Sequence, residues 1–473
     1  MGSNRYLVVS DLHLGDVENH PDGWKAHKAS RFVPDDGLRE LLEEFVEEAH
    51  EDEALTLVLN GDVFDFDLVT AVPSPPRWPL RRVERSCGMD ATEEKSVWKL
   101  EHILADHGVF LGALAALAAA GHTIVYVMGN HDRELHFPAV REAFVSAICA
   151  AGEERGLVVP EAPVRFEPWF FYVPGEVYAE HGQQYDFYCS FRYVLSPVVT
   201  PPGAEERLAL PMGNLSNRLM LSAMGSFNPH STDYILGAFG YFMHWLRLYA
   251  FTRRSLLFSW LLGSFRSLFG LLRNKRLTRQ RHLDYGALLR EHAERLGLDV
   301  DEVRALEALR EAPMTERLFG MVREYWIDRV LISVLMTGGT VALALTPIPL
   351  WIKLMVPLAC FPLIYLIYEN LIGASQLADV EHTAHRYAER IARELPVRVV
   401  TFGHSHAPIA QPLSRDVVYV NTGTWAPCLN ERALLKPRTL KAGMRNYLLI
   451  WFEGGACHTR LGSRMDLDPN PPV

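Results

Sequence analysis

Short apolar runs alternate with longer amphipathic segments through the first third of the chain. Apolar runs of strand length lie at residues 6–9, 57–59 and 124–128, and a polar residue or a glycine follows each of them. Residues 36–50 repeat apolar side chains at helical spacing, and residues 92–120 indicate one long helix that ends at Gly121. This alternation predicts a layered α/β domain in which helices connect parallel strands.

The pattern changes after residue 166. Pro174 and Gly175 separate two runs of aromatic and β-branched residues, which indicates a β-hairpin and the start of a more antiparallel half. Further strands are expected at residues 397–402, 417–421 and 447–452, with a last strand after Gly454 and Gly455. The pattern alone therefore predicts a mixed α/β fold that a long segment of different character interrupts.

That intervening segment contains two apolar runs. Residues 330–352 form an uncharged run of membrane-spanning length, and residues 354–368 form a shorter run that Pro357 and Pro362 interrupt. Two such runs indicate a helical hairpin that turns near residues 346–350. This turn leaves neither arm long enough to cross a bilayer comfortably, so we expect a re-entrant or shallow hairpin and not a double span.

A basic stretch precedes these runs. Residues 250–282 combine leucine, phenylalanine and Trp260 with arginine and lysine, and they contain no acid. The basic residues are Arg253, Arg254, Arg266, Arg273, Lys275, Arg276, Arg279 and Arg281. Such a segment is typical of an interfacial helix whose basic face meets an anionic membrane surface. The alternative is a helical subdomain or a homo-oligomer interface that buries the same apolar side chains inside protein.

Composition narrows the classes of protein that fit. The chain has 473 residues, 49% of them hydrophobic, and its formal net charge is −10. This is globular composition, with enough chain for a large domain and an insertion. An acidic chain argues against broad nucleic-acid binding, so no nucleic-acid partner is expected. Six scattered cysteines without a C-x-x-C pair, and no signal peptide before the first strand, favour a reduced, cytoplasmic protein.

Candidate metal ligands follow the predicted strands. Asp11 and His13 lie one residue apart where the first strand ends, so their side chains can close on one metal ion. Asp62 follows a glycine after the second strand, and its two oxygens suit a bridge between two ions. The other candidates are Asn130, His181, His404 and His406, with His131 and Asp132 beside Asn130. Oxygen and nitrogen ligands without thiolate suit Mn²⁺, our first choice, or Fe²⁺ or Zn²⁺.

The order of these motifs, D-x-H, G-D, G-N-H-D, H-G and G-H-x-H, resembles the calcineurin-like metallophosphoesterase superfamily. The resemblance covers residues 5–190 and 396–455. It implies an α/β fold of the metallophosphoesterase type, a β-sandwich flanked by helices with its ligands on loops at one edge. The catalytic domain would then be discontinuous, comprising residues 1–190 and 386–473. Residues 191–385 would form a mostly helical insertion that associates with a membrane.

The resemblance also implies a role for each motif. Two divalent ions would be bound, the first by Asp11, His13, Asp62 and His406, and the second by Asp62, Asn130, His181 and His404. His131 would lie beside the leaving oxygen as a general acid or transition-state stabiliser. Asp132 would either orient the His131 ring or cap the next turn. The polar turn at residues 421–425 would support the ligands.

One further residue is a candidate for binding substrate. Arg82 lies in a stretch with several prolines, residues 67–93, which indicates an irregular loop over the site. Its guanidinium could bind a substrate phosphate. The alternative is an ordinary solvated arginine.

These roles imply a hydrolase that cleaves a phosphate ester or pyrophosphate with a metal-activated water. Residues 10–14 resemble the start of the UDP-2,3-diacylglucosamine pyrophosphatases, which act on an acylated substrate at the membrane. That branch carries arginine where this chain has His131. We expect a phosphorylated small molecule as substrate, with a membrane lipid or lipid-linked phosphate as the favoured class, and a protein that is peripheral or monotopic at the inner face of the membrane.

Two other functions remain open at this stage. A nuclease or nucleotide phosphodiesterase of the same superfamily would need a basic groove near the site. The residues around the motifs are instead mostly acidic or aromatic. A non-catalytic, membrane-bound scaffold would be favoured by lost ligands, but every motif position is filled.

Overall fold

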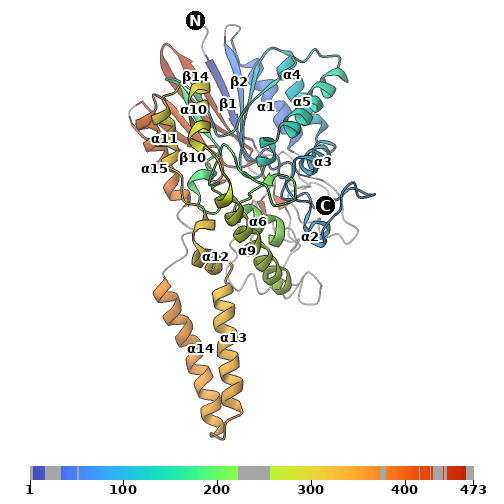
Figure 1. Ribbon diagram of the computed structural model, residues 1–473. Coiled ribbons are helices and arrows are strands. Elements are labelled where there is room, and N and C mark those ends of the chain that lie inside the picture. Colours follow the sequence, from blue (N-terminus) through green and yellow to red (C-terminus); the bar gives the residue numbers. More distant parts are fainter. Residues whose placement is uncertain are drawn as a thin grey trace.

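The computed structural model describes residues 4–15, 34–50, 53–221, 256–372, 380–414, 416–426, 428–429, 440–441 and 445–464. Two β-sheets face each other, and helices cover their outer faces (Figure 1). The mixed α/β fold expected from the sequence is therefore confirmed. Arg253 and Arg254 of the basic stretch lie outside the described residues.

The first sheet has the order β15-β14-β1-β2-β3-β4. Its parallel part consists of β1 (Asn4–Val9), β2 (Ala54–Asn60), β3 (Thr123–Val127) and β4 (Val164–Glu167). The strands β14 (Arg445–Glu453) and β15 (Ala456–Arg464) extend the sheet in antiparallel fashion beside β1. The carboxyl ends of β1, β2 and β3 consequently lie side by side at one edge.

The second sheet has the order β10-β11-β9-β6-β5. It consists of β5 (Phe170–Val173), β6 (Val177–Glu180), β9 (Val399–Phe402), β10 (Ile409–Pro412) and β11 (Val418–Asn421). The strands β5 and β6 form the expected antiparallel hairpin, whereas β6 and β9 run parallel. The short pairs β7 (Val198–Val199) with β8 (Arg207–Leu208) and β12 (Cys428–Leu429) with β13 (Leu440–Lys441) stand apart.

The alternation of side chains along β1 shows how the layers form. Tyr6 and Val8 point into the core between the sheets, and Leu7 and Val9 point to the helices on the other face. Those helices are α1 (Asp35–Glu47), α3 (Glu93–Leu104), α4 (Gly108–Ala119) and α5 (Pro138–Glu153). The outer face of the second sheet is covered by α10 (Tyr285–Leu296), α11 (Val300–Ala308) and α15 (Val380–Glu394).

The prediction of a single helix over residues 92–120 is wrong. The chain forms α3 and α4 instead, bent by 95° between them. His107 lies at the bend and is buried, with Nδ1 2.8 Å from Asp35 Oδ1 and Nε2 3.1 Å from the carbonyl oxygen of Gly15. These contacts with distant segments require the chain to turn, because an imidazole in a continuous helix would not reach both partners. A short helix, α2 (Arg82–Cys87), lies within residues 67–93, the stretch expected to be an irregular loop.

The remaining helices belong to the region expected to be an insertion. They are α6 (Met212–Ser216), the π-turn η5 (Asn217–Leu221), α9 (Leu256–Gln280), α12 (Leu318–Glu324), α13 (Ile327–Ala344) and α14 (Leu350–Ile372). Single 3₁₀ turns are η3 (Arg133–His136), η4 (Gln183–Tyr185) and η7 (Met314–Glu316). Leu215, Leu271 and Met321 bring α6, α9 and α12 into the same core as the helices of the first sheet. Among the described helices, α13 and α14 alone project away from the rest of the protein (Figure 1).

The expected length of the hairpin arms is also wrong. The arms contain 18 and 23 residues, and both are long and apolar enough to cross a membrane. Polar partners join the two helices at the base of the hairpin. Arg329 on α13 forms an ion pair with Glu369 on α14, with a nitrogen–oxygen distance of 2.8 Å. Tyr368 donates a hydrogen bond to Asp328.

Candidate metal centre

The loops that follow β1, β2, β3, β6 and β9 meet at one edge of the two sheets. Backbone hydrogen bonds join them: Asp11 N donates to the Gly61 carbonyl oxygen at 3.0 Å, and His13 N donates to that of Asp62 at 2.9 Å. From the second sheet, Gly403 N donates to the carbonyl oxygen of His181 at 2.9 Å. Carboxyl ends of parallel strands therefore bring residues far apart in sequence into one site.

The backbone at this edge is held in an uncommon conformation. Among the described non-glycine residues, positive φ angles occur at Asp11, His13, Asp62, His404 and His406, and otherwise only at Trp326. The left-handed region costs non-glycine residues free energy, and it persists where surrounding contacts impose it. Five of the predicted ligands thus have strained backbones that direct their side chains into the same space.

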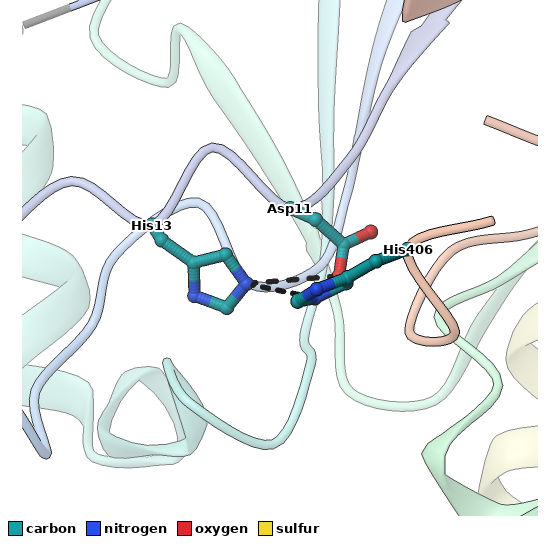
Figure 2. Close-up of side chains that lie close together, drawn as sticks. All are labelled: Asp11, His13 and His406. Carbon is teal, nitrogen blue, oxygen red and sulfur yellow. Dashed lines mark hydrogen bonds and ion pairs between the residues drawn. The ribbon is translucent and has the colours of Figure 1, made fainter. Parts of the chain in front are cut away.

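The first cluster consists of Asp11, His13 and His406 (Figure 2). His406 Nε2 lies 3.2 Å from both Asp11 Oδ1 and His13 Nε2, and His13 Nε2 lies 3.8 Å from Asp11 Oδ1. The opposite ring nitrogen of His13, Nδ1, faces Asp65 Oδ2 at 3.4 Å. Three potential donor atoms from two sheets therefore converge on one point.

The second cluster consists of Asp62, His181 and His404. His181 Nε2 lies 3.0 Å from Asp62 Oδ2. His181 Nδ1 donates to the carbonyl oxygen of Asn60 at 2.9 Å, which fixes the ring so that Nε2 faces Asp62. Asp11 Oδ1 lies 4.0 Å from His181 Nε2, so the two clusters adjoin.

The donor set fits divalent metal ions. Atoms bound about 2.1 Å from one metal lie roughly 3.0–3.4 Å from each other, and most of the separations above fall near this range. Asn130 offers a further metal-ligand atom, because neither polar atom of its buried side chain forms a hydrogen bond with described residues. A buried amide of this kind costs free energy unless a ligand engages it. The two clusters and Asn130 contain the seven residues predicted as ligands.

Burial and neighbouring imidazoles set the charge of the two central carboxylates. Burial raises the pKa of Asp62, but His181 and His131 outweigh this effect and hold the pKa well below its ordinary value. The same competition, mainly with His181 and His406, lowers the pKa of Asp11. Both groups are therefore anionic near neutral pH, as metal ligands must be.

His131 belongs to neither of these two clusters, although with His13 and Asp65 it forms a third group that could hold a metal ion. Its backbone N donates to Asp62 Oδ1 at 2.7 Å. Its Nδ1 lies 3.4 Å from Asp65 Oδ1 and 3.2 Å from Asp67 Oδ2. The His131 side chain is 14% exposed, whereas those of Asp65 and Asp67 are buried. The ring is therefore partly accessible to solvent while its Nδ1 contacts two buried carboxylates.

The expected roles of Asp132 are wrong. Its carboxylate neither contacts the His131 ring nor caps the following turn. It accepts hydrogen bonds from Gly129 N at 2.7 Å, Val63 N at 2.8 Å and the Tyr126 hydroxyl at 2.7 Å. Asp132 therefore fixes the loops after β2 and β3 to each other, and Asp65 and Asp67 are the carboxylates that face His131.

Arg82 is not placed at the site. Its side chain is exposed at the start of α2 and makes no hydrogen bond or ion pair with described residues. Its neighbour Arg81 turns the other way and pairs with Glu84 and Asp90. The structure thus favours the solvated alternative for Arg82.

Several residues that support the site were not found from the sequence. Glu180, next to His181, is fully buried and accepts hydrogen bonds from Trp169 Nε1 at 2.9 Å and from the hydroxyls of Tyr178 and Tyr185 at 2.6 and 2.7 Å. His404 Nε2 lies 2.9 Å from Asp186 Oδ2. The contact with Asp186 fixes the orientation of the His404 ring, and the hydrogen bonds of Glu180 hold the end of β6 just before His181.

Asn214 connects the insertion to the site. It lies on α6, is fully buried, and donates from Nδ2 to Asp67 Oδ2 at 2.6 Å and to the carbonyl oxygen of Asn130 at 2.9 Å. Two residues further, the hydroxyl of Ser216 lies 2.8 Å from that of Tyr325, just before α13. A short run of α6 thus contacts both the metal-site loop and the base of the projecting hairpin.

The polar turn after β11 supports the Asp11 loop as expected. Thr424 Oγ1 donates to the carbonyl oxygen of Asp11 at 2.9 Å, and Trp425 N donates to the same oxygen at 3.0 Å. Thr422 Oγ1 lies 2.6 Å from Ser10 Oγ. The C-terminal segment therefore completes a site that begins at the first strand.

Comparison with known proteins agrees with this geometry. The model of the calcineurin-like phosphoesterase family matches residues 5–202, which contain β1, β2, β3 and β6 with their loops. No curated protein matches the chain. Residues 5–202 therefore match the calcineurin-like phosphoesterase family, and together with the Asp/His clusters this match supports a metal-dependent hydrolase of phosphoester bonds.

Proposed function

We propose that the protein hydrolyses a phosphate ester or pyrophosphate with two divalent ions held at the edge of the sandwich. Asp11, His13, Asp62 and His406 hold one ion, and Asp62, Asn130, His181 and His404 hold the other. When bound, the ions supply a water of lowered pKa and neutralise phosphate charge. The observation that carries the proposal is the convergence of the two Asp/His clusters, 4.0 Å apart between Asp11 Oδ1 and His181 Nε2.

His131 and its neighbours perform the remaining chemistry. Asp65 and Asp67 face Nδ1 of the ring, so Nε2 is directed away from them. From there the imidazole donates a proton or a hydrogen bond to the leaving oxygen. Asn214 and Asp132 hold the backbone on both sides of the ring in place.

Manganese is the metal that we propose. The ligand set contains carboxylate, amide and imidazole groups, which suit Mn²⁺. One cysteine, Cys189, lies with Asp186 beside His404. Burial and Asp186 raise the pKa of its thiol well above the ordinary value, so it does not offer a thiolate that would favour Zn²⁺.

Metal removal tests the catalytic part of the proposal. We expect chelation to abolish hydrolysis of p-nitrophenyl phosphate and bis-p-nitrophenyl phosphate, and Mn²⁺ to restore it better than Mg²⁺ or Ca²⁺. The ratio of the two rates distinguishes monoesterase from diesterase activity. Folded protein with bound Mn²⁺ that turns over neither ester would contradict the proposal.

A membrane lipid or lipid-linked phosphate is the substrate class that we propose. Asn214 and Ser216 support it, because they connect the metal-site loop directly to the base of an exposed apolar hairpin. A panel of phosphorylated lipids and water-soluble pyrophosphates measures this preference. Faster turnover of every soluble substrate would count against it.

An anionic membrane surface is the proposed partner of α9. Leu262, Phe265 and Phe269 are exposed on this helix, close in sequence to the exposed Arg273 and Arg276. Arg281 differs from this expectation, because it donates to the carbonyl oxygens of Ser196 and Val198 inside the protein. Tighter binding to anionic than to neutral vesicles is expected, and equal binding to both would argue against a headgroup interaction.

A further inference from the structure

We propose that α13 and α14 cross a lipid bilayer as two complete spans, with the catalytic domain on one side and the turn between them on the other. The turn comprises residues 345–349, here called the tip. This inference concerns the hairpin alone and does not depend on the metal chemistry. The first observation is length: the two helices extend about 27 and 34 Å, against a hydrocarbon core of about 30 Å.

The helices expose apolar side chains in every direction. Leu331, Leu335 and Val341 on α13 are more than half exposed. On α14 the exposed apolar residues are Trp351, Leu354, Met355, Val356, Leu358, Leu363, Ile364, Leu366, Ile367 and Leu371. They are not confined to one stripe, so a second copy packed against one face would leave the rest in water. A lipid environment covers all of them.

Charges are confined to the two ends of the hairpin. Between Arg329 and Ala344 on α13, and between Lys353 and Glu369 on α14, no residue is charged. At the base, Arg329 pairs with Glu369, and its guanidinium also lies over the rings of Trp326 and Tyr368 at 5.5 and 5.8 Å. Paired charges and aromatic rings at this level are typical of the water–lipid interface.

The residues of the tip disfavour a re-entrant hairpin. Pro347 and Pro349 interrupt the helical backbone, and irregular backbone is not tolerated where it faces lipid. Lys353, one turn into α14, reaches back to donate to the carbonyl oxygen of Ala344 at 2.7 Å. In a re-entrant hairpin this ammonium group and the open carbonyls would lie in hydrocarbon, which disfavours both. In a complete span they reach water, beside Trp351 at the second interface.

The distribution of basic residues gives the orientation. Arg310, Arg317 and Arg323 lie within about 20 residues before α13, and Lys275 on α9 donates to the carbonyl oxygen of Glu316 in the same stretch at 3.5 Å. The tip side has Lys353 alone. By the positive-inside tendency, the base of the hairpin and the catalytic domain lie on the cytoplasmic side.

Thiol labelling of the full-length protein tests the topology. Three single substitutions are made: Thr346→Cys at the tip, Val158→Cys on the exposed surface between α5 and β4, and Leu335→Cys midway along α13. Each is probed with a membrane-impermeant maleimide in sealed vesicles of both orientations, and the unsubstituted protein gives the background from native thiols. Thermal unfolding confirms that the variants fold.

We expect T346C and V158C to be labelled in opposite vesicle orientations, and L335C in neither. Labelling of both T346C and V158C in the same orientation would overturn the inference in favour of a re-entrant or peripheral hairpin. Free labelling of L335C, or release of the unsubstituted protein by alkaline carbonate, would show that the hairpin lies in water or between protein copies. Because the readout is labelling, failure here is distinct from failure of the proposed hydrolysis.

Discussion

Replacing Asp62 with asparagine is expected to lower phosphoesterase activity by at least about 100-fold and to remove bound metal. Asp62 Oδ2 lies 3.0 Å from His181 Nε2, and Oδ1 accepts the backbone N–H of His131 at 2.7 Å. One carboxylate therefore serves the second ligand cluster and the loop that carries the proposed proton donor. An amide is neutral, and it offers one oxygen where two are used.

The comparison needs metal content as well as turnover. Metal analysis of Asp62→Asn should give less than the two ions per chain expected for the unsubstituted protein. Asp36→Asn is a matched control, because Asp36 is an exposed acid on α1 that lies 3.8 Å from Arg39 and belongs to neither ligand cluster. A D62N protein with full metal content and full activity would show that Asp62 is not the shared ligand.

The local pattern of the chain was enough to locate the ligand loops. Each of the strands β1, β2, β3 and β9 is a run of apolar residues broken by a glycine or a polar residue, and parallel strands end at a common edge. Gly61 illustrates the signal, since its φ is +82°, a backbone conformation that glycine adopts at little cost. Such constraints act within a few residues and therefore leave a mark in the sequence.

Contacts between segments far apart in the chain could not be predicted from the sequence in the same way. Asn214 is 84 residues from Asn130, and His107 is 72 residues from Asp35, yet these pairs decide how α6 meets the site and where α3 ends. The sequence showed Glu180 as an acid within an apolar strand, but it did not show the three side chains that donate hydrogen bonds to it. An acid that continues an apolar run is a usable signal of a buried, hydrogen-bonded carboxylate.

The helices α10 and α11 show an intermediate case. Asp299 accepts from Asp301 N at 2.7 Å while Glu302 accepts from Asp299 N at 2.8 Å, a capping box that the spacing of Asp299 and Glu302 already indicates. The sequence therefore contained the start of α11. It did not reveal that Leu289, Val303 and Leu306 pack on the second sheet, because amphipathic faces do not specify their partners.

Replacing His131 with alanine is expected to leave both ions bound while turnover falls by about 10²- to 10⁴-fold. The ring lies outside the two ligand clusters proposed for the ions and faces Asp65 and Asp67, so its loss removes no ligand of either ion. Metal analysis with parallel kinetics checks this. His122→Ala is the matched control, an imidazole at the opposite end of β3.

The leaving group distinguishes the two roles of His131. If the imidazole donates a proton, the deficit of His131→Ala should be small for p-nitrophenyl phosphate and much larger for an alkyl phosphate, because p-nitrophenolate leaves without protonation. If the imidazole stabilises charge on the phosphoryl oxygens, the two deficits should be equal. Burial lowers the pKa of His131, but Asp65, Asp62 and Asp67 outweigh this effect and raise the pKa well above its ordinary value. These carboxylates therefore favour a protonated ring. Loss of either ion from the alanine variant would instead mean that His131 is a metal ligand.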